Sequence, residues 1–382
     1  MDARQVLIAV NAADRITRAA LCRLGGCLDA WLEAGEDAAA ELAPALGVPA
    51  RQLRRALALR PRAAALADRE LERARRHRCR IVTLLDRDYP APLREHALPP
   101  PVLYCRGRLP DRPAVAIVGA RRMDAYGKEA AEVFARRLAA AGLTVVSGFA
   151  RGIDTAAHLA ALTAETGVTV AVLGCGLDVD YPRGSSRLAE RIAERGALVS
   201  EFGFGAEPLP WRFPIRNRVI AALSLGTLVV QATARSGSLI TAHQALELGR
   251  DVYAVPGRIF DDLSQGTNAL IADGALIARR PEDVLESLPL LQQQELFPSR
   301  KETGAATTAA TAPPSRRSDA AVGEPPDGFP GRVLEAVPAG DGRTSEDLAA
   351  AVGAPVDRVL AALLELELQG WVRREPGPVY VR

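Results

Sequence analysis

The length, composition and charge of the chain exclude several classes of protein. With 382 residues the chain is too long for one ordinary domain, and two or three domains are expected. Hydrophobic residues make up 48% and charged residues 25%, which is typical of a globular protein and excludes a disordered or fibrous one. A net charge of only +2 excludes a polycation that coats nucleic acid through composition alone, so any anion site must be local.

The sequence contains no pattern of membrane targeting or of cysteine-based sites. The amino-terminal stretch MDARQVLIAVNAADR lacks the basic segment and long apolar core of a signal peptide, and no later run reaches about 18 apolar residues. We therefore expect a cytoplasmic protein with no membrane partner. The five cysteines are odd in number and include no CxxC pair, so neither a disulfide framework nor a metal site is predicted.

Residues 1–78 have the pattern of short helices. Apolar periodicity in RITRAALCRLGGCLDAWLEAG is interrupted by the Gly25-Gly26 pair and followed by the helical pattern LAPALGVPARQLRRALAL. The segment is predicted to form a small helical domain of the SAM or helix-hairpin-helix kind.

Residues 79–290 alternate between strand and helix patterns. Short apolar runs rich in β-branched residues recur in this order: IVTLL, AVAIVGA, LTVVSGFA, VTVAVLGCG, ALVSEF, TLVVQA and DVYAVPG. The alternation predicts an α/β domain with a doubly wound, mostly parallel sheet that helices cover on both faces. Ligands of such sheets bind beyond the carboxyl ends of the strands, where the next helices begin.

The last 92 residues divide into a predicted linker and a small terminal domain. Residues 291–328 are rich in Ala, Thr, Pro, Ser and Gly without apolar periodicity, which indicates a flexible linker. Residues 329–382 predict three short helices and a hairpin, the order of a winged helix, with Thr344 and Asp347 placed as a capping box. Because this domain is not strongly basic, binding to DNA and binding to a protein both stay open.

Three turns that follow predicted strands have the composition of anion sites. Small residues let the backbone bend and expose its N–H groups, and the first of these turns adds arginine directly after Gly119. None of them contains GxGxxG, so no dinucleotide cofactor is predicted. The candidate residues of the three turns are Arg121, then Ser147, Gly148 and Gly152, then Ser236, Gly237 and Ser238.

The stretch RFPIRNRVIAALS places arginines at the start of a predicted helix. Pro214 fits the first turn, so Arg216 and Arg218 are expected in or near that turn. The helix dipole disfavours a cation there by several tenths of a kcal/mol. A negative group is therefore expected nearby.

Two kinds of negative group could neutralise these arginines. One is a carboxylate of the chain itself, such as Glu201 or Asp180. The other is a bound phosphate, in which case Phe213 could stack on a nucleobase. The residues of the stretch leave the two equally open.

The ordered motifs resemble those of the DNA-processing protein A family, also called DprA or Smf. They are IVGARR, SGFARGIDTAAH, LGCGLDVDYP, SEF, RFPIRNRVIAALS, SGSLITA and VPGRIFDDLSQGTNALIADGA, and they span about Arg80 to Leu288. The resemblance implies an extended Rossmann-like domain that binds single-stranded DNA and forms a homodimer. It also implies loading of the RecA recombinase onto DNA that enters during natural transformation.

The resemblance assigns DNA-binding roles to particular residues of this chain. Many members carry Glu where Gln231 ends a strand, so the electrostatics of the groove are in question there. The SGFARG loop and the SGS turn would add backbone and hydroxyl contacts to phosphate. The implied DNA-binding set is Arg121, Ser147, Gly148, Gly152, Phe213, Arg216, Asn217, Arg218, Ser236, Gly237 and Ser238.

Two other functions compete with DNA binding. Nucleotide hydrolases of the lysine-decarboxylase-like Rossmann group carry PGGxGTxxE, whereas this chain has ARSGSLITAHQ, without the glycine pair or the glutamate. A transcriptional regulator would need a basic recognition helix, and VDRVLAALLELELQG has one arginine and several glutamates. We therefore predict a protein without enzymatic activity, metal or cofactor that protects incoming single-stranded DNA and loads RecA.

Overall fold

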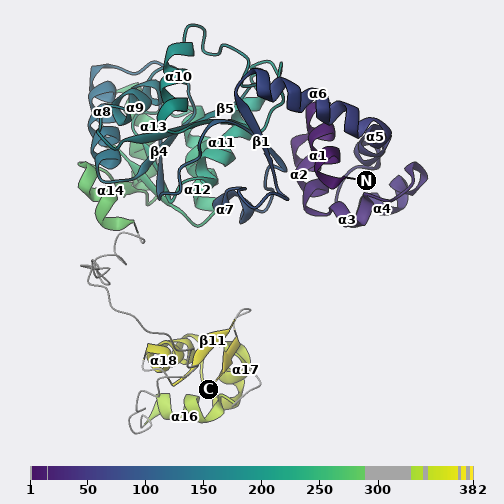
Figure 1. Ribbon diagram of the computed structural model, residues 1–382. Coiled ribbons are helices and arrows are strands. Elements are labelled where there is room, and N and C mark those ends of the chain that lie inside the picture. Colours follow the sequence, from purple (N-terminus) through teal and green to yellow (C-terminus); the bar gives the residue numbers. More distant parts are fainter. Residues whose placement is uncertain are drawn as a thin grey trace, which may run out of the picture. The chain divides into compact units, whose positions relative to one another are not determined.

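The computed structural model describes residues 2–14, 16–288, 328–338, 343–368, 371–375 and 379–381 (Figure 1). Its contacts form two compact units, Met1–Arg300 and Lys301–Arg382, which are treated separately below. Residues 291–327 of the expected linker lie outside the described ranges. Within those ranges no helix combines the length and apolar character needed to cross a lipid bilayer.

The first unit begins with a group of helices that share one core. Amphipathic patterns bury Leu7, Leu21 and Leu53 together with Trp31, and the side chains of Asp2 and Thr17 cap the first two helices. This core also contains residues of the first two strands of the sheet. The α-helices are α1 (Ala3–Ala12), α2 (Arg18–Gly26), α3 (Leu28–Trp31), α4 (Ala39–Ala45), α5 (Ala50–Leu59) and α6 (Ala63–Arg76).

A nine-stranded sheet forms the centre of the first unit. Its order is β1-β2-β6-β5-β4-β3-β7-β8-β9, parallel from β6 to β9, with β2 antiparallel to both β1 and β6. The predicted doubly wound, mostly parallel sheet is thereby confirmed. The strands are β1 (Cys79–Thr83), β2 (Val102–Gly107), β3 (Ala114–Val118), β4 (Thr144–Ser147), β5 (Val168–Leu173), β6 (Ala197–Ser200), β7 (Gly226–Val229), β8 (Asp251–Ala254) and β9 (Leu276–Ile277).

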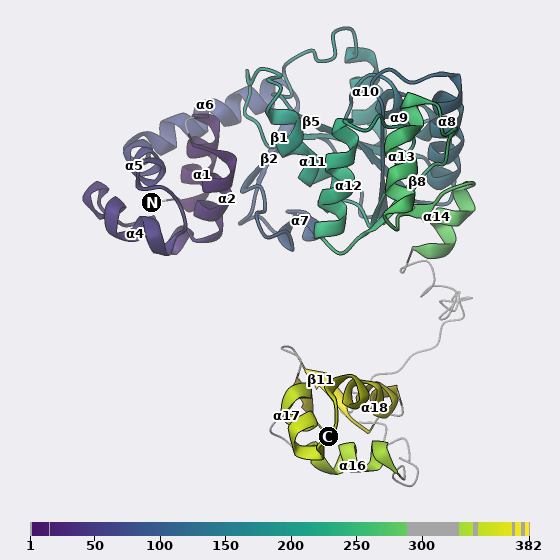
Figure 2. The same cartoon turned by 180° about the vertical axis from the view of Figure 1, so that it is seen from behind.

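Helices cover both faces of this sheet (Figures 1 and 2). Because side chains alternate along a strand, Val115 and Ile117 of β3 pack on the side of α8 and α9, whereas Ala116 and Val118 pack on the side of α11 and α12. The helices are α7 (Ala91–Arg94), α8 (Ala125–Ala140), α9 (Ile153–Ala161), α10 (Ser186–Arg195), α11 (Arg212–Ala222), α12 (Gly237–Glu247), α13 (Asp262–Ala272) and α14 (Pro281–Ser287).

The order of the strands reverses between β3 and β7. From β3 the chain proceeds to β4, β5 and β6 on one side, and α11 then returns it to β7 on the other side of β3. At such a switch point the loops on either side diverge and leave a crevice at the carboxyl ends of the strands. The turn after β3, the start of α11 and the start of α12 all border this crevice.

The second unit is a winged helix, as predicted. Val333, Leu348, Val359 and Leu363 form its buried centre, and Thr344 with Asp347 makes the predicted capping box. Its strands pair in the order β10-β12-β11. The elements are α16 (Phe329–Ala336), β10 (Arg343–Thr344), α17 (Ser345–Val352), α18 (Val356–Leu368), β11 (Arg373–Glu375) and β12 (Val379–Val381).

Candidate functional site

The turn after β3 presents arginine at the crevice. A Cβ added to Gly119 would lie 2.7 Å from the side chain of Ile153, so only glycine lets this turn pass so close to α9. The turn leaves the side chain of Arg121 exposed, with its guanidinium carbon 5.0 Å from the centre of the Phe213 ring. Within the described ranges neither Arg121 nor its neighbour Arg122 forms an ion pair.

The SGFARG loop after β4 supports this turn from inside the protein. The Ser147 hydroxyl is buried and donates to the carbonyl of Ile117 at 2.6 Å. Gly152 has a φ of +80°, and a Cβ there would clash with the backbone of Ala120 and Arg121. The loop therefore fixes the backbone of the arginine turn, and its serine hydroxyl has an internal partner.

The bounds of helix α11 place its arginines at different distances from the helix start. It begins at Arg212, two residues before Pro214, so Arg216 and Arg218 lie beyond its first turn. Pro214 therefore lies in the first turn, as expected, and Arg216 follows that turn directly. Among the helix arginines, Arg212 is thus the one at the positive end of the dipole.

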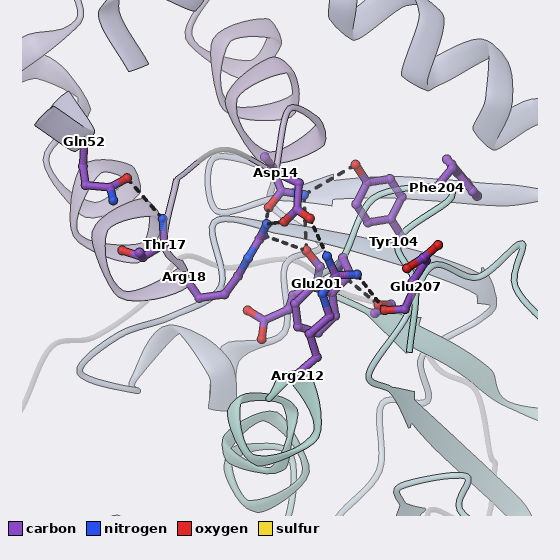
Figure 3. Close-up of polar contacts among 12 residues, drawn as sticks. Asp14, Thr17, Arg18, Gln52, Tyr104, Glu201, Phe204, Glu207 and Arg212 are labelled. Carbon is purple, nitrogen blue, oxygen red and sulfur yellow. Dashed lines mark hydrogen bonds and ion pairs between the residues drawn. The ribbon is translucent and has the colours of Figure 1, made fainter. Parts of the chain in front are cut away.

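Arg212 is neutralised by the amino-terminal helices (Figure 3). Its buried guanidinium forms an ion pair with Asp14, which follows α1, and donates to the carbonyl of Glu207 at 2.8 Å. The same Asp14 pairs with Arg18 of α2 at 2.8 Å. The rings of Phe202 and Trp211 each lie 5.0 Å from the guanidinium carbon of Arg212.

Arg218 is neutralised in a second buried ion pair. Its guanidinium contacts the carboxylate of Glu201, whose side chain is almost fully buried, and donates to the carbonyl of Leu98 at 2.6 Å. The attraction of Glu201 raises the pKa of Arg218 against the opposing effect of burial. Of the two expected kinds of negative group, a carboxylate is therefore confirmed for Arg218, and it is Glu201. Neither Arg218 nor Glu201 lines the crevice.

Arg216 differs from both neighbours because no carboxylate forms an ion pair with it in the described ranges. Its buried guanidinium donates to the carbonyls of Gly148 and Val172. Burial lowers the pKa of Arg216 to about 10, with Asp154 opposing that effect, so the side chain stays protonated at neutral pH. Burial likewise raises the pKa of the Asp154 carboxyl, although Arg216 pulls it down. A Cβ at Gly148 would contact both side chains, so Gly148 gives them room.

Phe213 lies between the two cations of the crevice. Its half-buried ring is 5.0 Å from the guanidinium carbon of Arg121, 5.9 Å from that of Arg216 and 5.4 Å from the ring of Tyr181. A Cβ at Gly174 would be only 3.0 Å from the Phe213 ring. Packing on these sides fixes the ring, and its remaining surface borders the crevice.

The start of α12 forms the opposite wall. Ser236 caps this helix, and its hydroxyl lies 2.8 Å from that of Ser238. Asn217 of α11 donates to the carbonyl of Gly237 at 3.2 Å and accepts from Nε of Arg216 at 3.1 Å. The amide of Asn217 thus joins the two helix starts, and the first turn of α12, whose N–H groups have no partner within the helix, lines the crevice.

These parts enclose a cavity of about 420 Å³ at the switch point. It is lined by most of the predicted residues, whereas Ser147, Gly148, Gly152 and Arg218 lie outside its lining. The lining also includes Arg122, Pro210, Asp154 and Leu263. Of these four, only Arg122 had a sequence signal, because it belongs to the arginine pair after Gly119. The predicted residues that line the cavity are Arg121, Phe213, Arg216, Asn217, Ser236, Gly237 and Ser238.

Gln231 does not face this cavity but holds the start of α8. Its Nε2 donates to Asp124 at 2.8 Å, and Asp124 caps the helix by accepting from Gly127 N at 2.8 Å. A carboxylate at position 231 would oppose that of Asp124, whereas the amide donates to it. The glutamine therefore has a structural role of its own.

The chemistry of the cavity suits a phosphate-bearing, aromatic ligand. Arginine, hydroxyl and helix N–H groups donate hydrogen bonds, and Phe213 offers a flat apolar surface. In the described residues no three His, Cys, Asp or Glu side chains are grouped as metal ligands. Burial raises the pKa of Cys175 to about 11, so its thiol is protonated at neutral pH.

Comparisons with known proteins agree with this architecture. Protein Smf of Escherichia coli is 43% identical over 270 residues, which are 70% of this chain and 67% of that protein. Protein Smf of Synechocystis is 37% identical and covers 82% of each chain. The X-ray structure of DNA processing protein A from Streptococcus pneumoniae matches with a TM-score of 0.61 and 35% identity, covering 74% of this chain and 96% of that one.

A further solved structure concerns DNA binding directly. DNA processing protein A from Helicobacter pylori, described for its single-stranded DNA binding mode, matches with a TM-score of 0.50 and 32% identity, covering 56% of this chain and 97% of that one. The family model of DNA recombination-mediator protein A matches residues 80–289, and that of the DprA winged helix domain matches residues 310–378. The chain therefore belongs to the DNA recombination-mediator protein A family, also known as DprA or Smf.

Proposed function

We propose that this protein binds single-stranded DNA in the cavity at the switch point and acts as a recombination mediator without enzymatic activity. The observation that carries the proposal is the Phe213 ring, which lies between two guanidinium groups that have no carboxylate partner in the described ranges. A ring beside unpaired cations suits a nucleobase with its phosphates.

The proposed contacts divide the predicted residues into two groups. Arg121 and the start of α12 bind phosphate, and Phe213 stacks on a base. A second group holds these contacts in place, because its polar atoms already have partners inside the protein. This second group consists of Ser147, Gly148, Gly152, Arg216, Asn217 and Arg218.

The mediator role is supported by family membership and by the chemistry of the cavity. We infer that the protein protects single-stranded DNA entering the cytoplasm during natural transformation and loads RecA onto it. We also infer a homodimer formed through the Rossmann-like domain. The edge strand β9 supports this inference, since Leu276 and Ile277 are exposed there and bare strand edges favour pairing with another chain.

Arg121→Ala is the variant that tests the DNA-binding proposal. We expect weaker binding of a fluorescent oligonucleotide and a shallower dependence of log K on log salt, by roughly one phosphate contact. Arg121 is exposed, so folding should be unaffected. Arg136→Ala on α8, also exposed but outside the cavity lining, is the matched control.

Unchanged affinity and salt slope in Arg121→Ala would contradict the cavity assignment. Turnover of a nucleoside monophosphate by the wild-type protein would instead favour a nucleotide hydrolase. RecA loading is checked separately, by RecA-driven strand exchange on protein-coated single-stranded DNA with and without this protein. Sedimentation velocity determines whether the protein is a dimer.

A further inference from the structure

The loop between β8 and α13 projects two apolar side chains into solvent. Phe260 is 91% exposed and Ile259 is 76% exposed, the two highest values among large hydrophobic residues in the described ranges. Single exposed apolar residues are ordinary, but two adjacent ones at a loop tip indicate a contact surface. The function assigned to the cavity does not account for them.

This loop is held firmly despite the exposure of its tip. The hydroxyl of Tyr126, on α8, donates to the carbonyl of Pro256 at 2.8 Å. Gly257 exchanges two hydrogen bonds with the side chain of Asn268, at 3.1 and 3.2 Å. Asp261 caps α13 by accepting from Leu263 N at 3.1 Å. Anchors on both sides of the tip hold the backbone that carries Phe260, which reduces the entropy lost when a ligand binds there.

The order of the strands places the tip of this loop beside the cavity. β3, β7 and β8 are parallel neighbours, so the turns after them lie in a row at one edge of the sheet. The turns after β3 and β7 line the cavity, and so does Leu263, three residues beyond Phe260. The carbonyl of Leu263 accepts from Ala232 N at 2.7 Å, which joins the start of α13 to the turn after β7.

Charge along this row favours a polyanion over an apolar protein partner. Four exposed arginines lie in the three turns, and none of them forms an ion pair in the described ranges. The two carboxylates beside the tip, Asp261 and Asp262, accept hydrogen bonds from Leu263 N and from Gln265 at 2.9 Å. Arginines interspersed with exposed aromatic rings are typical of surfaces that bind single strands. The four arginines are Arg121, Arg122, Arg235 and Arg258.

We propose that Phe260, with Ile259 beside it, is a second base-stacking platform for nucleotides of single-stranded DNA that extend beyond the cavity. The proposal rests on the proposed function of the cavity. Phe213 receives a base inside the cavity, and Phe260 receives a later base of the same strand outside it. Any base can occupy the platform, because every base has a flat face.

Two oligonucleotide lengths and three substitutions test this platform. We expect Phe260→Ala to weaken binding of an oligothymidylate of about sixteen nucleotides by about tenfold, and to leave binding of one of about four nucleotides unchanged. The salt slope should stay at its wild-type value, because no phosphate contact is lost. Phe260→Trp should restore affinity, whereas Phe260→Leu, which keeps apolar bulk without a ring, should behave like Phe260→Ala.

The control variant is Leu246→Ala, which removes a 54% exposed apolar side chain of α12 outside the cavity lining. The platform is overturned if Phe260→Ala binds the long oligonucleotide like the wild type, or if Phe260→Leu retains full affinity. A sedimentation coefficient that falls in Phe260→Ala without loss of DNA affinity would assign the tip to contact between two copies of the chain. If the wild type binds neither oligonucleotide, the cavity proposal itself fails, which is a distinct outcome.

Discussion

The two sides of α11 use the same residue type for different purposes. On the side toward the amino-terminal helices and β6, Arg212 and Arg218 are buried against Asp14 and Glu201. On the side toward the crevice, Arg216 is also buried, yet among the described residues only carbonyl groups and Asn217 accept its hydrogen bonds. The difference shows that carboxylate pairing separates the two arginines whose charge is neutralised from Arg216, whose charge keeps the crevice positive.

Neutralisation explains why the first side is structural. An arginine paired with a carboxylate presents little net charge to a ligand, and breaking a buried pair is costly. The crevice side keeps a positive field, since Asp154 is the only carboxylate among the residues lining the described cavity. Substitutions and pH changes can be chosen that affect either the ion-paired side of α11 or its crevice side.

The largest expected effect comes from Arg218→Ala. The variant leaves the buried carboxylate of Glu201 without its cation, and Glu201 Oε1 already lacks a hydrogen bond in the described structure. We expect the free energy of unfolding to fall by about 3–5 kcal/mol in urea denaturation. The double variant Arg218→Met, Glu201→Leu should recover much of this loss. A loss below about 1 kcal/mol in the single variant would show that the pair is not structural.

A smaller effect, a loss of about 2 kcal/mol in the free energy of unfolding, is expected when the pH is lowered below neutrality. Burial, followed by the charge of Arg216, lowers the pKa of His158 from 6.5 to about 3. The unfolded chain therefore binds the extra proton between these values, so stability is full above pH 6.5 and falls as the pH drops toward 3. Between pH 7 and 5 the loss from His158 should be about 2 kcal/mol.

Two variants separate the sources of this acid sensitivity. His158→Gln should make the free energy of unfolding depend less on pH in the acidic range. The dependence that remains should come from His96, whose pKa burial lowers to about 4. Arg216→Met should raise the pKa of His158, as measured by NMR titration, because it removes an unpaired positive charge. An unchanged His158 titration in Arg216→Met would mean that Arg216 is neutralised after all.

The smallest effect is expected from Asp14→Asn. Asp14 is partly exposed, so water can replace some of its contact with Arg212, and the loss should be about 1 kcal/mol in thermal unfolding. DNA affinity should keep its wild-type salt slope, because Arg212 contacts no ligand. A steeper slope would place the freed Arg212 among the phosphate-binding residues and remove the distinction between the two sides of α11.

The sequence by itself determined the local parts of this protein. β-Branched runs that end in small residues predicted the strands and turns of the sheet, because the apolar residues that a strand buries lie close together in the sequence. The glycine and serine turns located the crevice, since parallel strands bring their carboxyl ends to one edge. The Thr344 capping box was equally predictable, because its two residues are three positions apart.

Only the tertiary structure decided how the charges are paired. Asp14 and Arg212 are 198 positions apart, and no local pattern indicates that they meet. For the same reason the family resemblance assigned Arg218 to DNA and the SGFARG loop hydroxyl to phosphate, whereas in the structure Arg218 and Ser147 each have an internal partner. The periodicity of apolar residues indicates which side chains of a single helix or strand are buried. Which distant carboxylate neutralises a buried cation depends on the packing of whole elements.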